Sequence, residues 1–213
     1  MATVWAVVVA GGSGQRFGQM KQFALLAERP VVEWAVAACR PSATGVVLVL
    51  PRGSAGDVAH GADVVVEGGA TRAESVRLGL AAVPREAEVI VVHDAARPLA
   101  SDALFRAVIA AVASEGAGGA VPGVPVSDTI KMVDGTRTVT QTLDRSSLVA
   151  VQTPQAFAAE LLRRAHAEGG EATDDAALVE ALGATVRVVP GDPHNLKITT
   201  PADLGTAEHL LRG

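Results

Sequence analysis

Cysteine and tyrosine are the residues that this sequence has least of. Cys39 is the single cysteine among 213 residues, and tyrosine is absent. One cysteine excludes an intrachain disulfide and a metal site built from several cysteines. Because Cys39 follows the apolar residues 36–38, we expect a buried structural thiol.

Aromatic residues and clustered basic residues are also scarce, which argues against nucleic-acid-binding proteins. Aromatics make up 3% of the chain, too few for a surface that stacks single-stranded bases. The formal net charge is −5, and no segment concentrates Lys and Arg as a DNA-binding surface requires. We therefore expect no nucleic acid partner, and the positive charges that matter must act locally at a site.

Long hydrophobic runs are missing, although 49% of the residues are hydrophobic. The longest runs, at residues 4–10, 46–50 and 89–92, are far shorter than the ~20 residues that span a bilayer. No basic segment precedes a long apolar stretch near the N-terminus, so a signal peptide is not expected. The sequence predicts a cytoplasmic protein with no membrane partner and no second enzyme fused behind its closing helix.

What the sequence does contain is an alternation of short apolar runs and helix-like stretches. Strands are predicted at residues 4–10, 46–50, 63–67, 88–93, 118–124 and 185–189, and helices at 30–38, 71–83, 101–114, 160–168, 174–182 and 201–211. Such alternation indicates right-handed βαβ units and therefore an α/β fold, a mostly parallel sheet flanked by helices. The length suits one domain over residues 1–213.

The alternation breaks after Pro125. Residues 128–133 and 138–143 read as two strands around the turn Asp134-Gly135, the pattern of a β-hairpin. We expect this hairpin to project from the domain as an arm at about residues 126–147.

The strongest chemical signal follows the first predicted strand. Residues 10–18 read Ala-Gly-Gly-Ser-Gly-Gln-Arg-Phe-Gly, with Lys21 close behind. Ligands bind beyond the carboxyl ends of parallel strands, and glycines there let backbone N–H groups approach phosphate oxygens. The ending of a Walker A loop is absent, Phe17 stands where a dinucleotide fingerprint needs glycine, and Pro51 stands where it expects an acid. Arg16 and Lys21 instead suit a triphosphate whose α-phosphate gains negative charge during reaction.

Two further segments are candidates for the same site. Asp94 follows the predicted strand at 88–93 and is a natural magnesium ligand beside a triphosphate, with a helix or turn cap as its alternative role. His93 on its own is expected to be structural. Gly68 and Gly69 precede a helix whose start carries a capping box of Thr71 and Glu74. This segment is either an ordinary capped helix start or a pocket for an anion or a base edge.

Taken in order, these segments resemble the 2-C-methyl-D-erythritol 4-phosphate cytidylyltransferase family over nearly the whole chain. The resemblance rests on the glycine loop with Arg16 and Lys21-Gln22-Phe23, on Gly-Gly-x-x-Arg-x-x-Ser ending at Ser75, and on Val-His-Asp-Ala-Ala-Arg-Pro at 92–98. It continues through Asp-Thr-Ile-Lys at 128–131, Gln-Thr-Pro-Gln-x-Phe at 152–157, Thr-Asp-Asp at 173–175 and Asn-Leu-Lys-Ile-Thr-Thr-Pro at 195–201. It implies a Rossmann-like sheet of the nucleotidyltransferase type, and a homodimer formed through the arm with shared active sites. Met20 stands where the family usually has proline before the lysine.

The resemblance also implies a reaction and a set of site residues. CMP would pass from CTP to 2-C-methyl-D-erythritol 4-phosphate, releasing pyrophosphate, in the non-mevalonate isoprenoid pathway. The implied catalytic residues are Arg16 and Lys21 at the transition state, and Lys197 and the partner's Arg145 at the substrate phosphate. Mg²⁺ would be held by Asp94. The implied substrate pocket is lined by Arg97, Thr129, Thr153 and Thr173, and the implied CTP site by Ala10, Gly11, Gly12, Ser13, Gly14, Gly69, Ala70, Ser75, Asp94 and Ala95.

Three other interpretations stay open from the sequence. Ribitol-5-phosphate cytidylyltransferase is the nearest, because both substrates are phosphorylated polyols. A dinucleotide-binding dehydrogenase is opposed by the missing acid after the second strand. A non-catalytic nucleotide-binding regulator is opposed by Arg16, Lys21, Asp94 and Lys197 together, since binding alone needs no cations on both sides of the α-phosphate.

Overall fold

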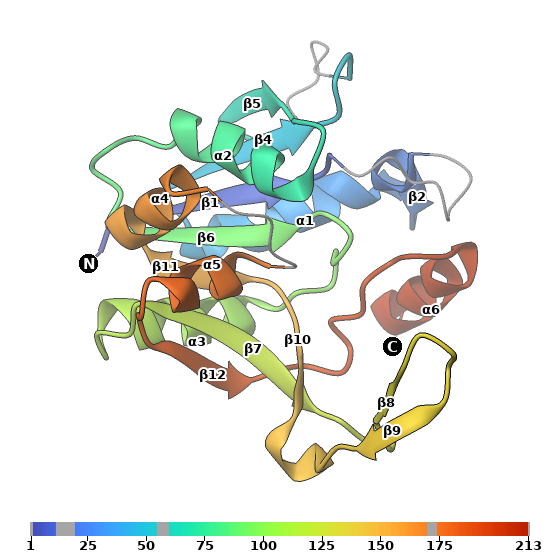
Figure 1. The fold of residues 1–213 in the computed structure, drawn as a ribbon. Coiled ribbons are helices and arrows are strands. Elements are labelled where there is room, and N and C mark those ends of the chain that lie inside the picture. Colours follow the sequence, from blue (N-terminus) through green and yellow to red (C-terminus); the bar gives the residue numbers. More distant parts are fainter. Residues whose placement is uncertain (1, 12–19, 55–59, 170–173, 213) are drawn as a thin grey trace.

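A central sheet of eight strands organises the chain, whose computed structural model describes residues 2–11, 20–54, 60–169 and 174–212 (Figure 1). Four parallel strands form one half of the sheet in the order β6-β1-β4-β5. In the other half, β11 runs antiparallel between β6 and β7, β10 is antiparallel to β7, and β12 is parallel to β7. The strands are β1 (Val4–Val9), β4 (Gly45–Leu50), β5 (Val64–Glu67), β6 (Val89–Asp94), β7 (Gly119–Pro125), β10 (Val149–Val151), β11 (Gln155–Ala158) and β12 (Val186–Pro190).

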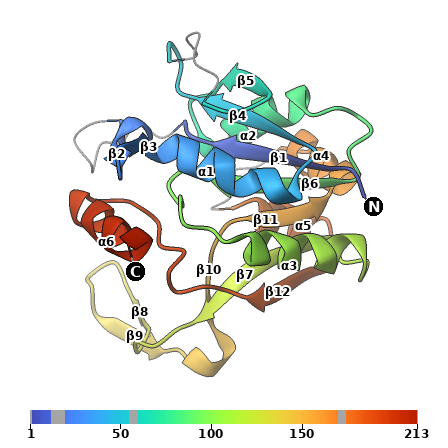
Figure 2. The same ribbon diagram turned by 180° about the vertical axis from the view of Figure 1, so that it is seen from behind.

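Helices cover both faces of this sheet, as Figures 1 and 2 show. One face carries α1 (Val31–Cys39) and α3 (Asp102–Ala113), and the other carries α2 (Arg72–Ala82), α4 (Ala159–Ala167) and α5 (Asp175–Ala181). Along β1 the side chains alternate between two buried clusters, with Ala6 and Val8 on the α1 side and Val7 on the α2 side. The predicted α/β fold with a mostly parallel sheet is therefore confirmed.

The C-terminal helix α6 (Pro201–Arg212) lies beside a small hairpin of β2 (Leu25–Leu26) and β3 (Arg29–Pro30). Short 3-10 turns occur at η2 (Lys21–Phe23), η3 (Arg40–Ser42) and η4 (Arg145–Ser147). Cys39 is fully buried, and burial raises the pKa of its thiol. Among the helices of the described residues, none is long and apolar enough to cross a membrane.

The sequence did not predict β10 and β11, which lie in the sheet. The segment 149–158 contains Pro154 after a cis peptide bond and two glutamines, so it lacks the apolar run of a buried strand. Its strand conformation comes from pairing: Gln155–Ala158 lies opposite Val89–Val92 of β6 and beside Gly119 and Ala120 of β7. Tertiary contacts therefore decided what local composition did not indicate.

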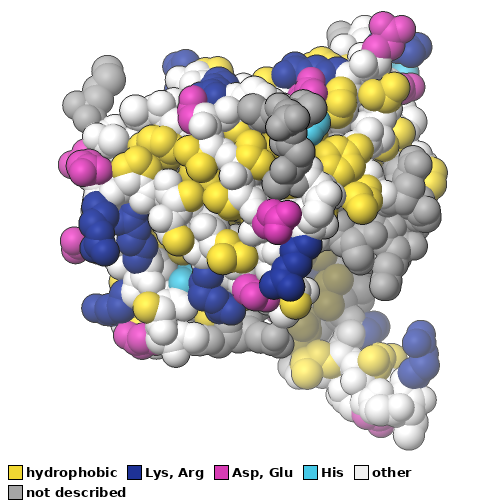
Figure 3. Space-filling model, turned by 90° about the horizontal axis from the view of Figure 1, so that it is seen from above, with side chains coloured by type: hydrophobic (Ala, Val, Ile, Leu, Met, Phe, Trp, Pro, Cys, Tyr) yellow, Lys and Arg dark blue, Asp and Glu magenta, His cyan; other side chains and the backbone are white. Residues whose placement is uncertain are grey.

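The predicted hairpin is present and stands clear of the main body (Figures 1 and 3). Strands β8 (Lys131–Val133) and β9 (Val139–Thr142) pair antiparallel, with a register shift next to Val133. At the turn, the Asp134 carboxylate accepts hydrogen bonds from the backbone N–H groups of Thr136 and Thr138. Every residue of both strands is exposed. Whether the arm forms a dimer stays a prediction.

Parallel pairing brings the two strongest sequence signals to one edge of the sheet. Val9, the last residue of β1, is aligned with Asp94, the last residue of β6. The chain leaves the sheet at this edge after both strands, which is where α/β folds bind their ligands. Figure 3 shows positive and negative side chains interspersed with apolar ones on the face seen from above.

Candidate active site

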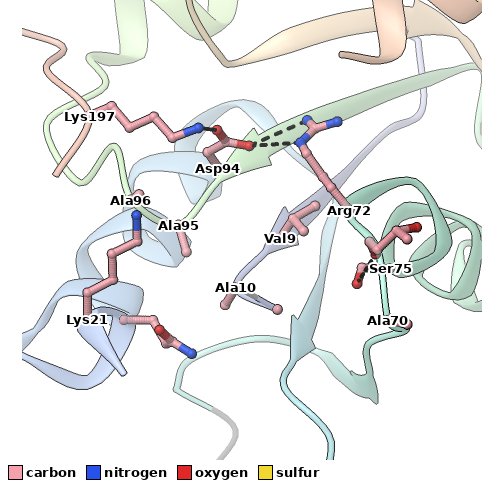
Figure 4. Close-up of a pocket in the computed structure, with 13 residues that line it drawn as sticks. Val9, Ala10, Lys21, Ala70, Arg72, Ser75, Asp94, Ala95, Ala96 and Lys197 are labelled. Carbon is pink, nitrogen blue, oxygen red and sulfur yellow. Dashed lines mark hydrogen bonds and ion pairs between the residues drawn. The ribbon is translucent and has the colours of Figure 1, made fainter. Parts of the chain in front are cut away.

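A pocket of about 370 Å³ lies at this carboxyl edge (Figure 4). Ala10 lies in its middle, with Lys21 on one side and Arg72 and Ser75 on the other (Figure 4). The lining residues are Val9, Ala10, Gly11, Lys21, Gln22, Ala70, Thr71, Arg72, Ser75, Asp94, Ala95, Ala96 and Lys197. Segments from distant parts of the chain therefore converge on one cavity.

Asp94 is the acidic centre of the pocket and is paired with two cations. Its Oδ2 atom lies 2.6 Å from Lys197 Nζ, and its Oδ1 atom lies 3.4 Å from Arg72 Nη2. The side chain is 12% exposed. Burial by itself raises the pKa of Asp94, but the charges of Arg72 and Lys197 outweigh it and lower the pKa to about 2. The carboxylate is therefore ionised throughout the neutral pH range.

The Asp94→Asn variant should flatten the acid limb of the stability curve. Because the folded-state pKa lies below the ordinary value, the carboxylate stabilises the fold fully above pH ~4 and loses this effect as pH falls through about 2. The pKa difference corresponds to about 2 kcal/mol at neutral pH. Urea unfolding at pH 7 and pH 3 should show the stability gap between wild type and variant narrowing by about half at pH 3. A stability difference that is the same at pH 7 and pH 3 would contradict the lowered pKa of Asp94.

Behind Asp94 a buried polar network fixes its backbone. The Asp94 N–H donates to Thr153 Oγ1 at 3.0 Å, and Thr153 Oγ1 lies 3.2 Å from His93 Nδ1. His93 Nε2 lies 3.1 Å from the Arg97 carbonyl oxygen, and burial lowers the His93 pKa to about 4. The neutral ring must therefore donate from Nε2 to that carbonyl, and Nδ1 accepts from the Thr153 hydroxyl. Arg97 Nη1 in turn donates to the Asn195 carbonyl oxygen at 2.7 Å.

The two lysines of the pocket approach from different elements. Lys21 comes from η2, and its Nζ donates to the Ile198 carbonyl oxygen at 2.9 Å. Ile198 N–H donates to the Ala96 carbonyl oxygen at 2.8 Å, which ties the segment carrying Lys197 to the loop after β6. The η2 turn, the loop after β6 and the segment before α6 are thus joined around the pocket.

Several backbone N–H groups assigned to CTP are engaged within the protein in this structure. Ala10 donates to Val49 O at 2.8 Å and Ala95 donates to Val9 O at 3.0 Å. Gly69 donates to Ser75 Oγ at 3.1 Å, and Ala70 donates to Glu74 Oε2 at 2.6 Å. The Thr71 side chain caps α2 by accepting from Glu74 N–H at 3.1 Å, as the capping box predicted. Contact between a base and the Ala70 N–H would require the Glu74 carboxylate to turn away.

The structure brings together one group of the predicted residues and places the others elsewhere. Ala10, Gly11, Lys21, Ala70, Ser75, Asp94, Ala95 and Lys197 line the pocket. Gly69 is adjacent, while Thr153 and Arg97 lie behind Asp94. Thr129 and Arg145 lie on the arm, where Arg145 Nη1 donates to the Ser127 carbonyl oxygen. Gly12, Ser13, Gly14, Arg16 and Thr173 lie outside the described residues. The functional roles of all these residues stay predictions.

Arg72, the arginine of the Gly-Gly-x-x-Arg-x-x-Ser segment, is a pocket residue to which the sequence analysis assigned no role. It opens α2, lines the cavity and contacts Asp94. A signal was available, because a cation in the first turn of a helix opposes the helix dipole and so needs another reason to be there. That reason is a pair of carboxylates, Asp94 and Asp175, contributed by other elements.

The residues present fit a metal ion that arrives with a nucleotide. Among the described residues, no three His, Cys, Asp or Glu side chains gather as a complete metal site. Mg²⁺, however, is commonly bound by one or two carboxylates together with substrate phosphate oxygens. Asp94 can supply such a carboxylate, because it is ionised and lies in the pocket wall.

Comparison with known proteins places the chain in a family. The family model described as IspD, 2-C-methyl-D-erythritol 4-phosphate cytidylyltransferase, matches residues 4–213. The chain belongs to this family. A 2-C-methyl-D-erythritol 4-phosphate cytidylyltransferase from Saccharopolyspora erythraea is 54% identical, over 69% of this chain and 67% of that protein. One from Rubrobacter xylanophilus is 44% identical over 99% of this chain and 96% of that protein.

A solved structure extends the similarity to the fold. The crystal structure of the 2-C-methyl-D-erythritol 4-phosphate cytidylyltransferase from Thermus thermophilus has a TM-score of 0.83 and 39% sequence identity, covering 97% of this chain and 98% of that one. Membership confirms that the chain is a nucleotidyltransferase that uses CTP and methylerythritol phosphate in the non-mevalonate pathway. None of these relatives is a ribitol-5-phosphate cytidylyltransferase, so that alternative gains no support.

Proposed function

We propose that the pocket around Asp94 is where CMP is transferred from CTP to methylerythritol phosphate, in a homodimer that works with Mg²⁺. The observation that carries the assignment is the convergence of Lys21, Asp94 and Lys197 on one cavity at the carboxyl edge of the sheet. A phosphate that attacks the α-phosphorus of CTP is already anionic near neutral pH, so no general base is required. Catalysis then depends on alignment and on stabilising negative charge.

The lysines supply the charge stabilisation in this proposal. Lys21 lies beside the start of the glycine loop and would face the α-phosphate, together with Arg16. Lys197 would leave Asp94 and bind the substrate phosphate, since its side chain is 43% exposed and long enough to turn. A cation close to both reacting groups offsets the charge that gathers at the α-phosphorus in the transition state.

Asp94 is proposed to hold the magnesium ion. When bound, this ion neutralises the phosphate oxygens of CTP and orients the triphosphate. Two features of the protein support this role. The Asp94 carboxylate is ionised, and the Asp94 backbone is fixed by hydrogen bonds through Thr153 and His93. Release of Lys197 from Asp94 would make one carboxylate oxygen available at the same moment as a cation for the substrate.

The homodimer is proposed from the arm. Met132, Val133 and Val139 on its strands are 48–55% exposed, and Val149 and Val151 of β10 at its base are 41% and 40% exposed. A second copy of the arm would cover these exposed apolar side chains. Arg145 and Thr129 would then reach the partner's pocket.

A cytoplasmic location also stays part of the proposal, supported by the single cysteine.

The direct test is pyrophosphate release from CTP and Mg²⁺, with methylerythritol phosphate and ribitol 5-phosphate assayed in parallel. The proposal expects turnover with methylerythritol phosphate and little with ribitol 5-phosphate. Turnover restricted to ribitol 5-phosphate would keep the nucleotide site but overturn the substrate. No turnover with either acceptor would refute the assignment of the pocket as an active site.

The Arg145→Ala variant should lose most of its use of methylerythritol phosphate, because its guanidinium is expected to bind the substrate phosphate in the partner's pocket. Mixing Arg145→Ala with Lys21→Ala protein should then restore activity, since a mixed dimer contains one pocket with both intact residues. The measurement is turnover before and after subunit exchange, with each variant alone as control. Proven exchange without recovered activity would count against a shared site.

A further inference from the structure

Beyond Arg72, a chain of polar contacts continues from the pocket into the core. Arg72 Nη1 lies 2.8 Å from Asp175 Oδ2, and Asp175 Oδ1 lies 2.9 Å from His166 Nε2. Both of these inner residues are buried, Asp175 with 1% and His166 with 3% of its surface exposed. The pocket wall is therefore connected through one guanidinium to a carboxylate–imidazole pair between α4 and α5.

Helix capping does not explain why Asp175 is there. The neighbouring Asp174 is the N-cap of α5, and its Oδ1 accepts from the Ala177 N–H at 3.1 Å. The other oxygen of Asp174, Oδ2, accepts from Gln155 Nε2 at 3.2 Å. Asp175 therefore does not serve as the helix cap. Its Oδ2 atom contacts Arg72, and its Oδ1 atom contacts His166.

Stability does not explain the trio of Arg72, Asp175 and His166 either. A buried Asp is rare unless paired, and replacing a buried ion pair by apolar residues is often neutral or stabilising. The fold therefore gains little from placing Asp175, Arg72 and His166 together. A functional reason is indicated by the position of Arg72, whose guanidinium lies between Asp175 and the Asp94 carboxylate.

The two carboxylates hold Arg72 unequally. The ion pair with Asp175 measures 2.8 Å, whereas Asp94 Oδ1 accepts two longer hydrogen bonds, from Arg72 Nε and Nη2, at 3.4 Å each. Asp94 has its own closer cation in Lys197, at 2.6 Å. If Asp94 exchanges its partners when a nucleotide binds, Arg72 keeps a counter-ion and stays on the pocket wall. Without Asp175, the half-buried guanidinium would have Asp94 as its remaining carboxylate partner and would compete for it.

We propose that Asp175 is a positioning residue that holds Arg72 in place by the shorter ion pair and thereby leaves Asp94 able to change partners, with His166 orienting the Asp175 carboxylate. This inference rests on the proposed function of the pocket. It assigns a task to the second aspartate of the Thr-Asp-Asp segment and to a histidine outside every motif of the sequence analysis.

The test replaces Asp175 by Asn, which keeps the size and one oxygen but removes the charge. The kcat/KM for CTP should fall ~10–100-fold, the usual effect of losing a partner that orients a ligand-binding group. CTP affinity measured by calorimetry in the presence of Mg²⁺ should fall with it. In an Arg72→Met background, the same Asp175→Asn change should have little further effect, because Asp175 acts through Arg72.

The chain offers a control in a second trio, which consists of an arginine, a glutamate and a histidine. Arg29 Nε lies 3.6 Å from Glu33 Oε2, and His60 Nδ1 lies 3.1 Å from Glu33 Oε1, away from the pocket. The Glu33→Gln variant should leave kcat/KM and CTP affinity within about 2-fold of wild type, because none of the three residues of this trio lines the pocket. Equal losses in Glu33→Gln and Asp175→Asn, or a full further loss in the Arg72→Met background, would overturn the proposal.

The experiment also covers two other outcomes: an Asp175→Asn variant that does not fold, and a wild-type protein that shows no turnover. If Asp175→Asn does not fold, His166 takes its place: His166→Gln keeps a donor toward Asp175 and should retain turnover better than His166→Leu, with this difference absent in the Arg72→Met background. Equal turnover of the two His166 variants would overturn the proposal. If wild type itself shows no turnover, the proposed function fails, and the CTP affinities of Asp175→Asn and Glu33→Gln still decide whether Asp175 positions the pocket.

Discussion

The Lys21→Ala variant is expected to lose ~10²–10³-fold in kcat while remaining folded, the range typical for one preorganised group that stabilises a transition-state charge. Lys21 lines the pocket from η2, and its Nζ is already placed by a hydrogen bond to the Ile198 carbonyl oxygen. In the proposed site the cation would therefore be held near the position where negative charge develops. Because its side chain is not part of the apolar core, its removal should cost little stability.

The measurement is pyrophosphate release at saturating CTP and methylerythritol phosphate, with thermal unfolding recorded for the same samples. Arg164→Ala is a suitable control, because Arg164 is an exposed cation on α4 that pairs with Glu168, the C-cap residue of that helix. Its turnover should equal that of wild type. A loss below about 5-fold in Lys21→Ala would assign this lysine to binding or structure rather than to the transition state.

The Asp94→Asn variant should lose ~10²-fold or more in kcat, as much as Lys21→Ala or more, and for a different reason. Asparagine fills the same space but carries no charge, so it binds a divalent cation weakly and leaves Lys197 without its carboxylate. Lys197 and Arg72 also lose the acidic group that fixes their orientation in the pocket. The effect should therefore appear in binding as well as in turnover.

Calorimetry with CTP, in the presence and absence of Mg²⁺, separates these contributions. Wild type should bind CTP more tightly with the metal, and Asp94→Asn should lose most of that difference. Asp63→Asn provides the control, because Asp63 pairs with Arg40 and lies outside the pocket. An Asp94→Asn variant that keeps the full magnesium dependence would refute the assignment of Asp94 as the metal ligand.

Much of the fold was predictable because its signals are local. The buried strands β1, β4 and β6 are continuous apolar runs, and the start of α2 carries its capping pair in the sequence. The arm was predictable because two short strands flank a turn containing Asp134 and Gly135. In contrast, β11 is short, begins with a glutamine and follows a proline, so only its neighbours β6 and β7 make it a strand of the sheet.

The residues of the candidate site also fall into those that the sequence predicted and those that only the structure revealed. Lys21, Asp94 and Lys197 were predictable because each belongs to a motif, and the first two follow or closely follow a predicted strand. Arg72 also belongs to a motif, but its role was not predictable, because that role depends on carboxylates that are 22 and 103 positions away along the chain. Thr153 was expected in the substrate pocket, but its hydroxyl contacts His93 and the Asp94 backbone, and its contact with substrate stays a prediction.

The sequence by itself determined the α/β class, the family, and the motif residues that carry charge to the pocket, because strand periodicity and short motifs are encoded within a few neighbouring positions. Only the tertiary structure decided which of these charges meet: that Asp94 is shared by Lys197 and Arg72, that Arg72 has a second and closer carboxylate in Asp175, and that His166 lies behind it. The physical reason is distance along the chain. Ion pairs between elements depend on how helices pack on the sheet, and no local pattern records that packing.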